Sequence, residues 1–452
     1  MCLAKPLLYL LILGLSRSKN PRVSFMGGPS IGISWQHDCL SSCGLTNFGS
    51  STSLETDVDN CSILHFGRDK NLGIQVVSRK QCDLYQGDAF YRITLDSLEY
   101  QTKYYYRTNC DDTIYSFVTA QEPGVVESFT FAVYADMGTI HAESTLARLH
   151  GHREELVGHI FAGDIGYADD AFTNAESYLT RTNRFLEALA PSSAYIPVMV
   201  APGNHEAEDH TPLCLTSPLC RSGYGNFTAF NCIWNMPETK GHSMWSSFDY
   251  GPVHFVLTNT ETDYAGAPLE PFGEIGFIPT GKFGLPGEYT EWLRNDLQTA
   301  ASNEYIRWIV VVGHRPITVL DETLDDYKTP LNQEIIALIN TYADVYVAGH
   351  VHYYTRSVPR PPSALPVYIT VGGAGCDEWD ERTVKTTISG STTVFDYYAF
   401  GNEQTYSLLK FSKDKPNEIV FEVYGSVGGQ LVDRVVVPVR TRKSANTVVL
   451  TQ

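Results

Sequence analysis

The sequence predicts two domains, an all-β sandwich followed by an α/β domain. Residues 21–120 contain short runs rich in β-forming residues, separated by Gly, Asn and Asp, which is typical of a sandwich. The stretch from Gln121 to Gly124 then interrupts the strand pattern with Pro and Gly, as a linker does. From residue 125 to 440, apolar runs alternate with helical patterns, which indicates an α/β domain. A chain of 452 residues is long enough for two or three domains.

Residues 1–18 are predicted to be a signal peptide. Lys5 precedes an apolar run from Pro6 to Leu15, which is shorter than the ~20 residues of a transmembrane helix. The C-terminal residues NTVVLTQ resemble neither a lipid-anchor tail nor an ER-retention signal. We therefore expect a secreted, extracellular protein, or one in the lumen of the secretory pathway, without a membrane anchor. The alternative is an ordinary buried segment, which Arg17 and Lys19 disfavour because they end the run abruptly.

The composition indicates a folded acidic protein. Hydrophobic residues make up 43% of the chain and charged residues 19%, which excludes disordered and fibrous classes. The formal net charge of −18 disfavours nucleic acids and anionic membrane surfaces as partners. Small anions can still bind where cations gather locally. The oligomeric state stays open.

The cysteines suit an oxidising compartment. Nine remain after the predicted signal peptide: Cys39, Cys43, Cys61, Cys82, Cys110, Cys214, Cys220, Cys232 and Cys376. Because nine is odd, at least one thiol is unpaired or bonded to another molecule. Zinc binding is the alternative, but no paired CxxC motifs support it. Asn60 and Asn226 begin glycosylation sequons, which a secreted chain could use.

The predicted sandwich strands are short. They include Ile31–Trp35, Gly73–Val77, Tyr91–Leu95 and Tyr104–Arg107. The segment LEYQTKYYYR resembles the tyrosine corner of a fibronectin-type-III-like domain, and Leu98, Thr102 and Tyr104 carry that resemblance.

In the α/β domain, four segments have helical patterns. They are Ser144–Val157, Glu176–Leu189, Glu291–Ala301 and Gln333–Tyr342. The region from Cys214 to Trp245 is rich in loop residues and contains three cysteines, so we expect a surface loop held by disulfides.

Five apolar runs in this domain each end in a polar residue that can bind a metal ion. The runs are Phe129–Ala135 before Asp136, Ile160–Ala162 before Asp164, Val198–Ala201 before Asn204, Ile309–Val312 before His314, and Val345–Ala348 before His350. In an α/β sheet the carboxyl ends of strands face the ligand crevice, so these side chains are expected to converge. A glycine lies close to each of them, which allows tight turns and close backbone approach.

The donor set contains carboxylates, an amide, imidazoles and the phenol of Tyr167, which suits iron, manganese or zinc. Seven such residues are too many for one tetrahedral zinc, but they fit two ions if Asp164 bridges them. A free phenol has a pKa near ~10, so a phenolate ligand at acidic pH requires a strongly Lewis-acidic ion such as iron(III).

Five blocks with these residues resemble the metal-ligand blocks of purple acid phosphatases, in the same order. They are Asp136-Met137-Gly138, Gly163-Asp164-Ile165-Gly166-Tyr167, Gly203-Asn204-His205-Glu206, Val311-Val312-Gly313-His314 and Gly349-His350-Val351-His352. The resemblance extends from the sandwich to Pro366–Gly375. It implies a fibronectin-like β-sandwich followed by the two-sheet αββα sandwich of metallophosphoesterases.

By matching position, the resemblance implies one set of ligands for iron(III) and another for a divalent ion, which is zinc, manganese or iron(II). The iron ligands would be Asp136, Asp164, Tyr167 and His352, and the divalent-ion ligands Asp164, Asn204, His314 and His350. Two such ions neutralise phosphate charge and lower the pKa of bound water, so that a metal-bound hydroxide attacks phosphorus.

His205 follows the predicted ligand Asn204 and is the expected general acid for the leaving group. Plant members of the family carry histidines soon after the His314 block, whereas residues 315–330 of this chain contain none. Glu206 and His242 are therefore alternative candidates for the acid. For Glu206 a structural role is equally compatible with the sequence, and His242 is as compatible with an ordinary loop histidine.

The sequence thus predicts a secreted acid phosphatase that hydrolyses phosphate monoesters of small molecules. One alternative is a phosphodiesterase or nucleotide pyrophosphatase that uses the same site. Another is a non-catalytic extracellular metal-binding glycoprotein, against which the complete ligand set argues.

Overall fold

The computed structural model of the protein describes residues 18–38, 60–84, 88–169, 178–207, 226–237, 241–267, 281–317, 331–359, 365–376 and 395–440. Apart from Ser18, the predicted signal peptide lies outside these residues. So do Cys39, Cys43, Cys214 and Cys220, and with them residues 214–225 and 238–240 of the predicted cysteine-containing loop.

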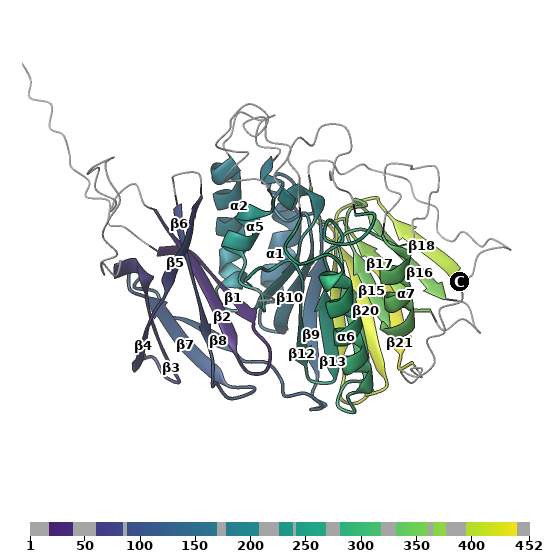
Figure 1. The fold of residues 1–452 in the computed structure, drawn as a ribbon, viewed down its shortest axis with the longest axis horizontal. Helices are drawn as coiled ribbons and strands as arrows, with labels where there is room; N and C mark the ends of the chain where they lie inside the picture. The colour runs from purple at the N-terminus through teal and green to yellow at the C-terminus, as the bar shows by residue number, and fades with distance from the viewer. Residues whose placement is uncertain are drawn as a thin grey trace, which may run out of the picture.

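The first part of the chain forms two four-stranded antiparallel sheets (Figure 1). Their strand orders are β1(Ser18–Phe25)-β2(Ile31–Asp38)-β6(Asp88–Leu95)-β5(Arg79–Leu84) and β4(Ile74–Val77)-β3(Ile63–Gly67)-β7(Lys103–Thr108)-β8(Tyr115–Val118). Trp35 stacks on Tyr91 in their core, with 5.7 Å between ring centroids. The Tyr104 hydroxyl accepts a hydrogen bond of 3.1 Å from the backbone N–H of Glu99, as a tyrosine corner requires. The prediction of a β-sandwich is confirmed.

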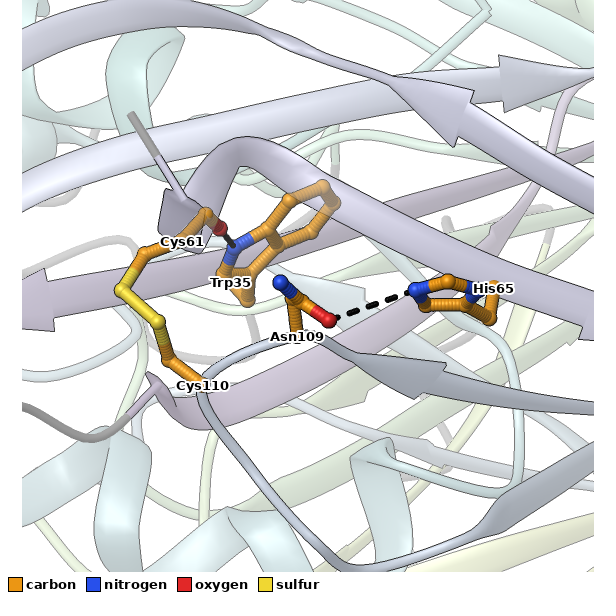
Figure 2. Close-up of a disulfide and its surroundings, with 5 residues drawn as sticks. All are labelled: Trp35, Cys61, His65, Asn109 and Cys110. Atoms are coloured by element: carbon orange, nitrogen blue, oxygen red, sulfur yellow. Dashed lines mark hydrogen bonds between the residues drawn. A yellow bond between two sulfur atoms is a disulfide. The ribbon is translucent and has the colours of Figure 1, made fainter. Parts of the chain in front are cut away.

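A disulfide between Cys61 and Cys110 links the short helix η2(Asn60–Ser62) to the residues after β7 (Figure 2). The indole N–H of Trp35 donates a hydrogen bond of 2.9 Å to the carbonyl oxygen of Cys61, which joins the core to the disulfide. Cys232 is also disulfide-bonded, whereas the buried Cys376 is a free thiol. The free thiol of Cys376 agrees with the odd cysteine count, which leaves at least one thiol unpaired or bonded to another molecule.

The second part contains two larger sheets. The six-stranded sheet has the order β11(Val198–Ala201)-β10(Leu156–Ala162)-β9(Phe129–Tyr134)-β19(Thr405–Phe411)-β20(Glu418–Gly425)-β21(Leu431–Pro438). The seven-stranded sheet has the order β12(Ser246–Tyr250)-β13(Val253–Leu257)-β14(Trp308–Val312)-β15(Val345–Ala348)-β17(Val367–Val371)-β16(Tyr354–Pro359)-β18(Phe395–Phe400). Strands β9, β10 and β11 are parallel, and so are β13, β14, β15 and β17. All five predicted apolar runs form strands, and each of these strands belongs to one of the two parallel groups.

The helices of this part are α1(Glu143–Gly151), α2(Tyr178–Ser193), α5(Thr228–Ile233), α6(Glu288–Ser302) and α7(Gln333–Tyr342). The four predicted helices are present with shifted ends, except that α7 has the predicted bounds, and α5 is additional. The prediction that the first helix reaches Val157 was wrong. The helix ends at Gly151, and Leu156 pairs with Thr130 of β9, because a β-branched, buried run can join the sheet. Helix α2 continues four residues past the predicted end at Leu189, with Pro191 in its last turn.

Aromatic side chains join the two large sheets and the sandwich in one core. Phe131 of β9 lies 4.9 Å from Phe255 of β13, measured between ring centroids. Phe25 of the sandwich strand β1 stacks on Phe248 of β12 at 5.4 Å. Burying each such ring stabilises the fold by ~1.5–3 kcal/mol. In Figure 1 the sandwich strands form one end of the molecule and the C-terminal strands the other, with α6 and α7 in front of the seven-stranded sheet.

Candidate metal centre

The seven predicted ligands lie at the carboxyl ends of parallel strands. Asp136 follows β9, Asp164 and Tyr167 follow β10, and Asn204 begins the turn after β11. His314 follows β14 in the other sheet, and His350 follows β15. His352 comes two residues later. Because parallel strands end at the same edge, the fold brings residues that are far apart in sequence to one place.

Contacts divide these side chains into two groups. In the first, the Tyr167 hydroxyl lies 3.1 Å from Asp136 Oδ1 and 3.1 Å from His352 Nε2. In the second, His314 Nε2 lies 3.0 Å from Asn204 Oδ1 and 2.9 Å from Asp164 Oδ2.

His350 belongs to the second group and also links the two. One donor atom from each of Asp164, His314 and His350 lies within 4.8 Å of the others. The backbone N–H of His350 donates a hydrogen bond of 2.9 Å to Asp136 Oδ2, so the second group is adjacent to the first.

The backbone is strained at four of the seven residues. Asp136, Asp164, Tyr167 and His350 have φ values of 55°, 50°, 47° and 68°, in the left-handed region. A non-glycine residue there costs of order 1–3 kcal/mol and persists only where its surroundings hold it, which is characteristic of functional sites.

Two glycines allow the strand ends to approach each other. A Cβ atom on Gly203 would lie 2.3 Å from Asp164 Oδ1, and one on Gly349 would lie 2.4 Å from Asp136 Oδ2. Real Cβ atoms do not approach so closely. These two positions therefore require glycine for steric reasons, as the sequence suggested.

Glu206 fastens the ligand-bearing turns to one another. Its carboxylate accepts hydrogen bonds of 2.8 Å from the backbone N–H groups of Asp164, Ile165 and Gly203. Burial and the charge of Asp164 raise the pKa of Glu206 to about 8, although the N–H donors favour the charged form. Of the two roles considered for Glu206, this geometry favours the structural one.

His205 lies between the two groups and a buried carboxylate. Its ring packs on Tyr167 with 4.2 Å between centroids, and its backbone N–H donates a hydrogen bond of 2.8 Å to Asp164 Oδ1. Its Nδ1 lies 2.9 Å from Asp169 Oδ2. Because a carboxylate only accepts, Nδ1 must carry a proton, and proton exchange with a ligand falls to Nε2.

A mostly apolar pocket adjoins His205 and Glu206, lined by side chains of α2 and α5 such as Phe185 and Phe230. The other candidate for the acid, His242, packs edge-on against Trp245 with 4.2 Å between centroids. His242 also packs against Phe283, so its surroundings are largely aromatic.

Arg315 and Glu261 were missed by the sequence reasoning. Glu261 comes four residues after the end of β13, so it had a weaker form of the signal of the five predicted ligands, a polar residue soon after a largely apolar run. Nε and Nη2 of Arg315 lie 2.9 Å from Glu261 Oε2 in a buried ion pair. Asp169, two residues after Tyr167, was missed as well.

The electrostatics suit a metal ligand at His350. Burial, together with the charges of Arg315 and His314, holds the pKa of His350 well below its usual range. The imidazole is therefore neutral, which is the form that binds metal ions. Cys376 lies beside the first group, and its backbone N–H donates a hydrogen bond of 3.0 Å to the carbonyl oxygen of Asp136.

The chain is similar to known phosphatases. The profile of the calcineurin-like phosphoesterase family matches residues 129–354, half of the chain. "Acid phosphatase A" of Cryphonectria parasitica is 28% identical, over 75% of this chain and 79% of its own length. "Acid phosphatase type 7" of Mus musculus is 26% identical over 64% of each chain, and "Purple acid phosphatase 22" of Arabidopsis thaliana is 27% identical over 64% of this chain. The chain spans only 60% of the length of the Arabidopsis protein.

Solved structures support the fold. A purple acid phosphatase from yellow lupin (Lupinus luteus) seeds matches with a TM-score of 0.65 and 16% identity, covering 94% of this chain and 74% of the lupin chain. The predicted fold class, a β-sandwich followed by a two-sheet α/β domain, is confirmed.

The matches also bear on the predicted chemistry. They confirm the prediction of a phosphoric ester hydrolase, and this type of enzyme implies a two-metal centre and a small phosphate ester as substrate. The chain belongs to the calcineurin-like phosphoesterase family, and its resemblance to the purple acid phosphatases within that family is confirmed.

Proposed function

We propose that this protein is a secreted acid phosphatase that hydrolyses phosphate monoesters at a centre of iron(III) and a divalent ion. The observation that carries the proposal is the division of the predicted ligands into two adjacent contact groups. Tyr167, Asp136 and His352 form one group, which holds three of the four iron(III) ligands implied by the resemblance. The fourth, the proposed bridge Asp164, lies in the adjacent group. His314, Asn204, Asp164 and His350 form the other, in agreement with the divalent set.

The residues present fit two metal ions. Asp164 Oδ2 is buried and lies 2.9 Å from His314 Nε2. A side chain at position 203 or 349, where the chain has glycine, would clash with the carboxylate of Asp164 or Asp136. Oxygen and nitrogen donors of this kind suit iron with zinc, manganese or iron(II). Bound there, two ions would supply charge neutralisation for phosphate and a water-derived nucleophile at mildly acidic pH.

His205 is proposed to protonate the leaving oxygen. Asp169 holds the imidazole through Nδ1 and favours its protonated form, and packing on Tyr167 fixes the plane of the ring. Nε2 then exchanges the proton with the ester oxygen. The mostly apolar pocket beside His205 offers an apolar surface to an uncharged leaving group.

Secretion remains part of the proposal. The Cys61–Cys110 disulfide supports an oxidising compartment, and the sequons at Asn60 and Asn226 are compatible with it. The Asn226 side chain, however, exchanges hydrogen bonds with the backbone of Gly281, which makes Asn60 the better candidate for a glycan. Among the described residues, no helix has the length and apolar character needed to cross a membrane.

The test is metal analysis combined with a substrate panel. Purified protein should contain two ions per chain, show a violet tyrosinate-to-iron(III) absorption that Tyr167→Phe abolishes, and hydrolyse aryl phosphates at acidic pH. Faster turnover of diesters or nucleotide anhydrides than of monoesters would favour the phosphodiesterase alternative. Full metal occupancy without turnover of any phosphoester would favour the non-catalytic alternative. Colourless protein with both ions bound would overturn the iron assignment alone.

A further inference from the structure

Arg315 is a buried arginine with two different contacts. One edge of its guanidinium is bound by Glu261, and Nη1 faces the predicted metal ligand His350. Nε and Nη2 both donate to Glu261 Oε2 at 2.9 Å. Nη1 lies 3.3 Å from His350 Nε2. The arginine therefore connects a buried carboxylate to one of the predicted metal ligands.

The backbone around this pair is fixed as well. The Thr260 hydroxyl accepts hydrogen bonds from the backbone N–H groups of His314 at 3.2 Å and Arg315 at 3.1 Å, and it donates to Glu261 Oε1 at 2.8 Å. Tyr346 donates from its hydroxyl to the carbonyl oxygen of Arg315 at 2.7 Å. A guanidinium oriented in this way loses little conformational entropy when it binds a ligand.

The contact with His350 is incompatible with metal binding by that residue. A neutral imidazole has one lone pair and one N–H. Once His350 ligates an ion through either nitrogen, the other nitrogen carries the proton, so Nε2 has no lone pair left for Arg315. The N–H of Nη1 that faces His350 then needs another acceptor within the same site, because an unsatisfied buried charged donor is costly.

We propose that Arg315 binds a non-bridging oxygen of the substrate phosphate through Nη1, while Glu261 holds its other two nitrogens. This inference rests on the proposed function, because it places the phosphate at the predicted ions. It assigns phosphate recognition on the divalent-ion side to an arginine, in a chain that has no histidine at positions 315–330. Arginine suits this role because its planar N–H donors match phosphate oxygens.

The experiment is a calorimetric titration of inorganic phosphate into the metal-loaded protein, together with metal analysis. For Arg315→Gln we expect unchanged metal content and a phosphate Kd raised at least ~10-fold, equivalent to ~1.4 kcal/mol. Arg315→Lys, which keeps the charge without the planar fork, should give a smaller rise. The matched control is Arg294→Gln, which removes an arginine from the exposed Arg294–Glu334 pair of α6 and α7 and should leave the Kd unchanged.

An unchanged phosphate Kd in fully loaded Arg315→Gln would overturn the inference and leave the proposed function standing. Loss of metal from that variant would overturn it too, because Arg315 would then support the ligands and not the substrate. If the loaded wild-type protein binds no phosphate, the proposed function fails together with the inference. Metal content and the phosphate Kd, measured for the wild type and for Arg315→Gln, distinguish these three outcomes.

Discussion

Histidine–carboxylate clusters occur at both ends of the parallel strands, and they differ in what surrounds them. At the carboxyl ends, His314, His350 and Asp164 converge, and two of these residues have positive φ values. At the opposite end of β13, His254 is held between Asp249 and Asp296, with Nδ1 at 2.6 Å and Nε2 at 3.0 Å from carboxylate oxygens.

The comparison shows how a site differs from a structural ion cluster built from the same residue types. Both nitrogens of His254 are paired with carboxylates, so the imidazole has no nitrogen left with which to bind a ligand. At the carboxyl ends, the backbone is strained and several side-chain donor atoms converge, which is characteristic of a ligand-binding site. Substitutions at the two ends of the strands should therefore have different effects.

The largest effect is expected for Asp164→Asn. This carboxylate is the proposed bridge, so losing its charge should weaken binding of both ions and reduce kcat/KM by ~10³-fold or more. Metal analysis after dialysis and the rate on an aryl phosphate measure the two effects. Unaltered metal content in this variant would contradict the proposed bridge.

A smaller loss is expected for His205→Gln and for Asp169→Asn. Both should reduce kcat by ~10²–10³-fold with metal content unchanged, because general acid catalysis contributes on that scale. A nitrophenyl phosphate, whose leaving group needs little protonation, should lose much less rate than an alkyl phosphate. Equal losses on the two substrates would show that His205 is not the acid.

Gly203→Ala tests whether the tight turns hold the site together. The added Cβ would lie 2.3 Å from Asp164 Oδ1, and such overpacking lowers the free energy of unfolding by ~1–3 kcal/mol. The matched control is Gly73→Ala in the sandwich, where no atom lies within 4 Å of the new Cβ, and we expect a change within ~0.5 kcal/mol. Denaturant unfolding measures both, and similar values for the two variants would contradict the steric argument.

The smallest effect on activity is expected at the opposite end of the strands, for His254→Gln. Burial lowers the pKa of His254, but hydrogen bonds to Asp249 and Asp296 raise it to about 9 overall. A pKa raised on folding stabilises the protein fully below the unfolded value of ~6.5, and this contribution is lost as the pH rises through 9.

His254→Gln should therefore lower the free energy of unfolding by ~1–3 kcal/mol at about pH 6 and much less at about pH 10, with metal content and kcat unchanged at the lower pH. Urea unfolding at the two pH values measures this. A loss of stability that does not depend on pH would show that His254 acts through packing and not through its charge.

The sequence by itself determined the strands and the polar residues at their ends. Alternating and apolar runs are local patterns, so β11, β15 and α7 have the predicted bounds and the predicted ligands stand at strand ends. The order of the blocks along the chain was enough to predict the family. The local pattern failed where two states competed, as at Leu156, which pairs with β9 and does not continue α1.

Only the tertiary structure decided which strand ends became neighbours. Asp169 is 36 residues from its partner His205, and Glu261 is 54 residues from Arg315. Such pairs depend on sheet order and on how two sheets pack, which local periodicity does not encode. The same reason explains why histidines that looked alike in sequence separated into a candidate metal centre at one end of the strands and a saturated ion cluster at the other.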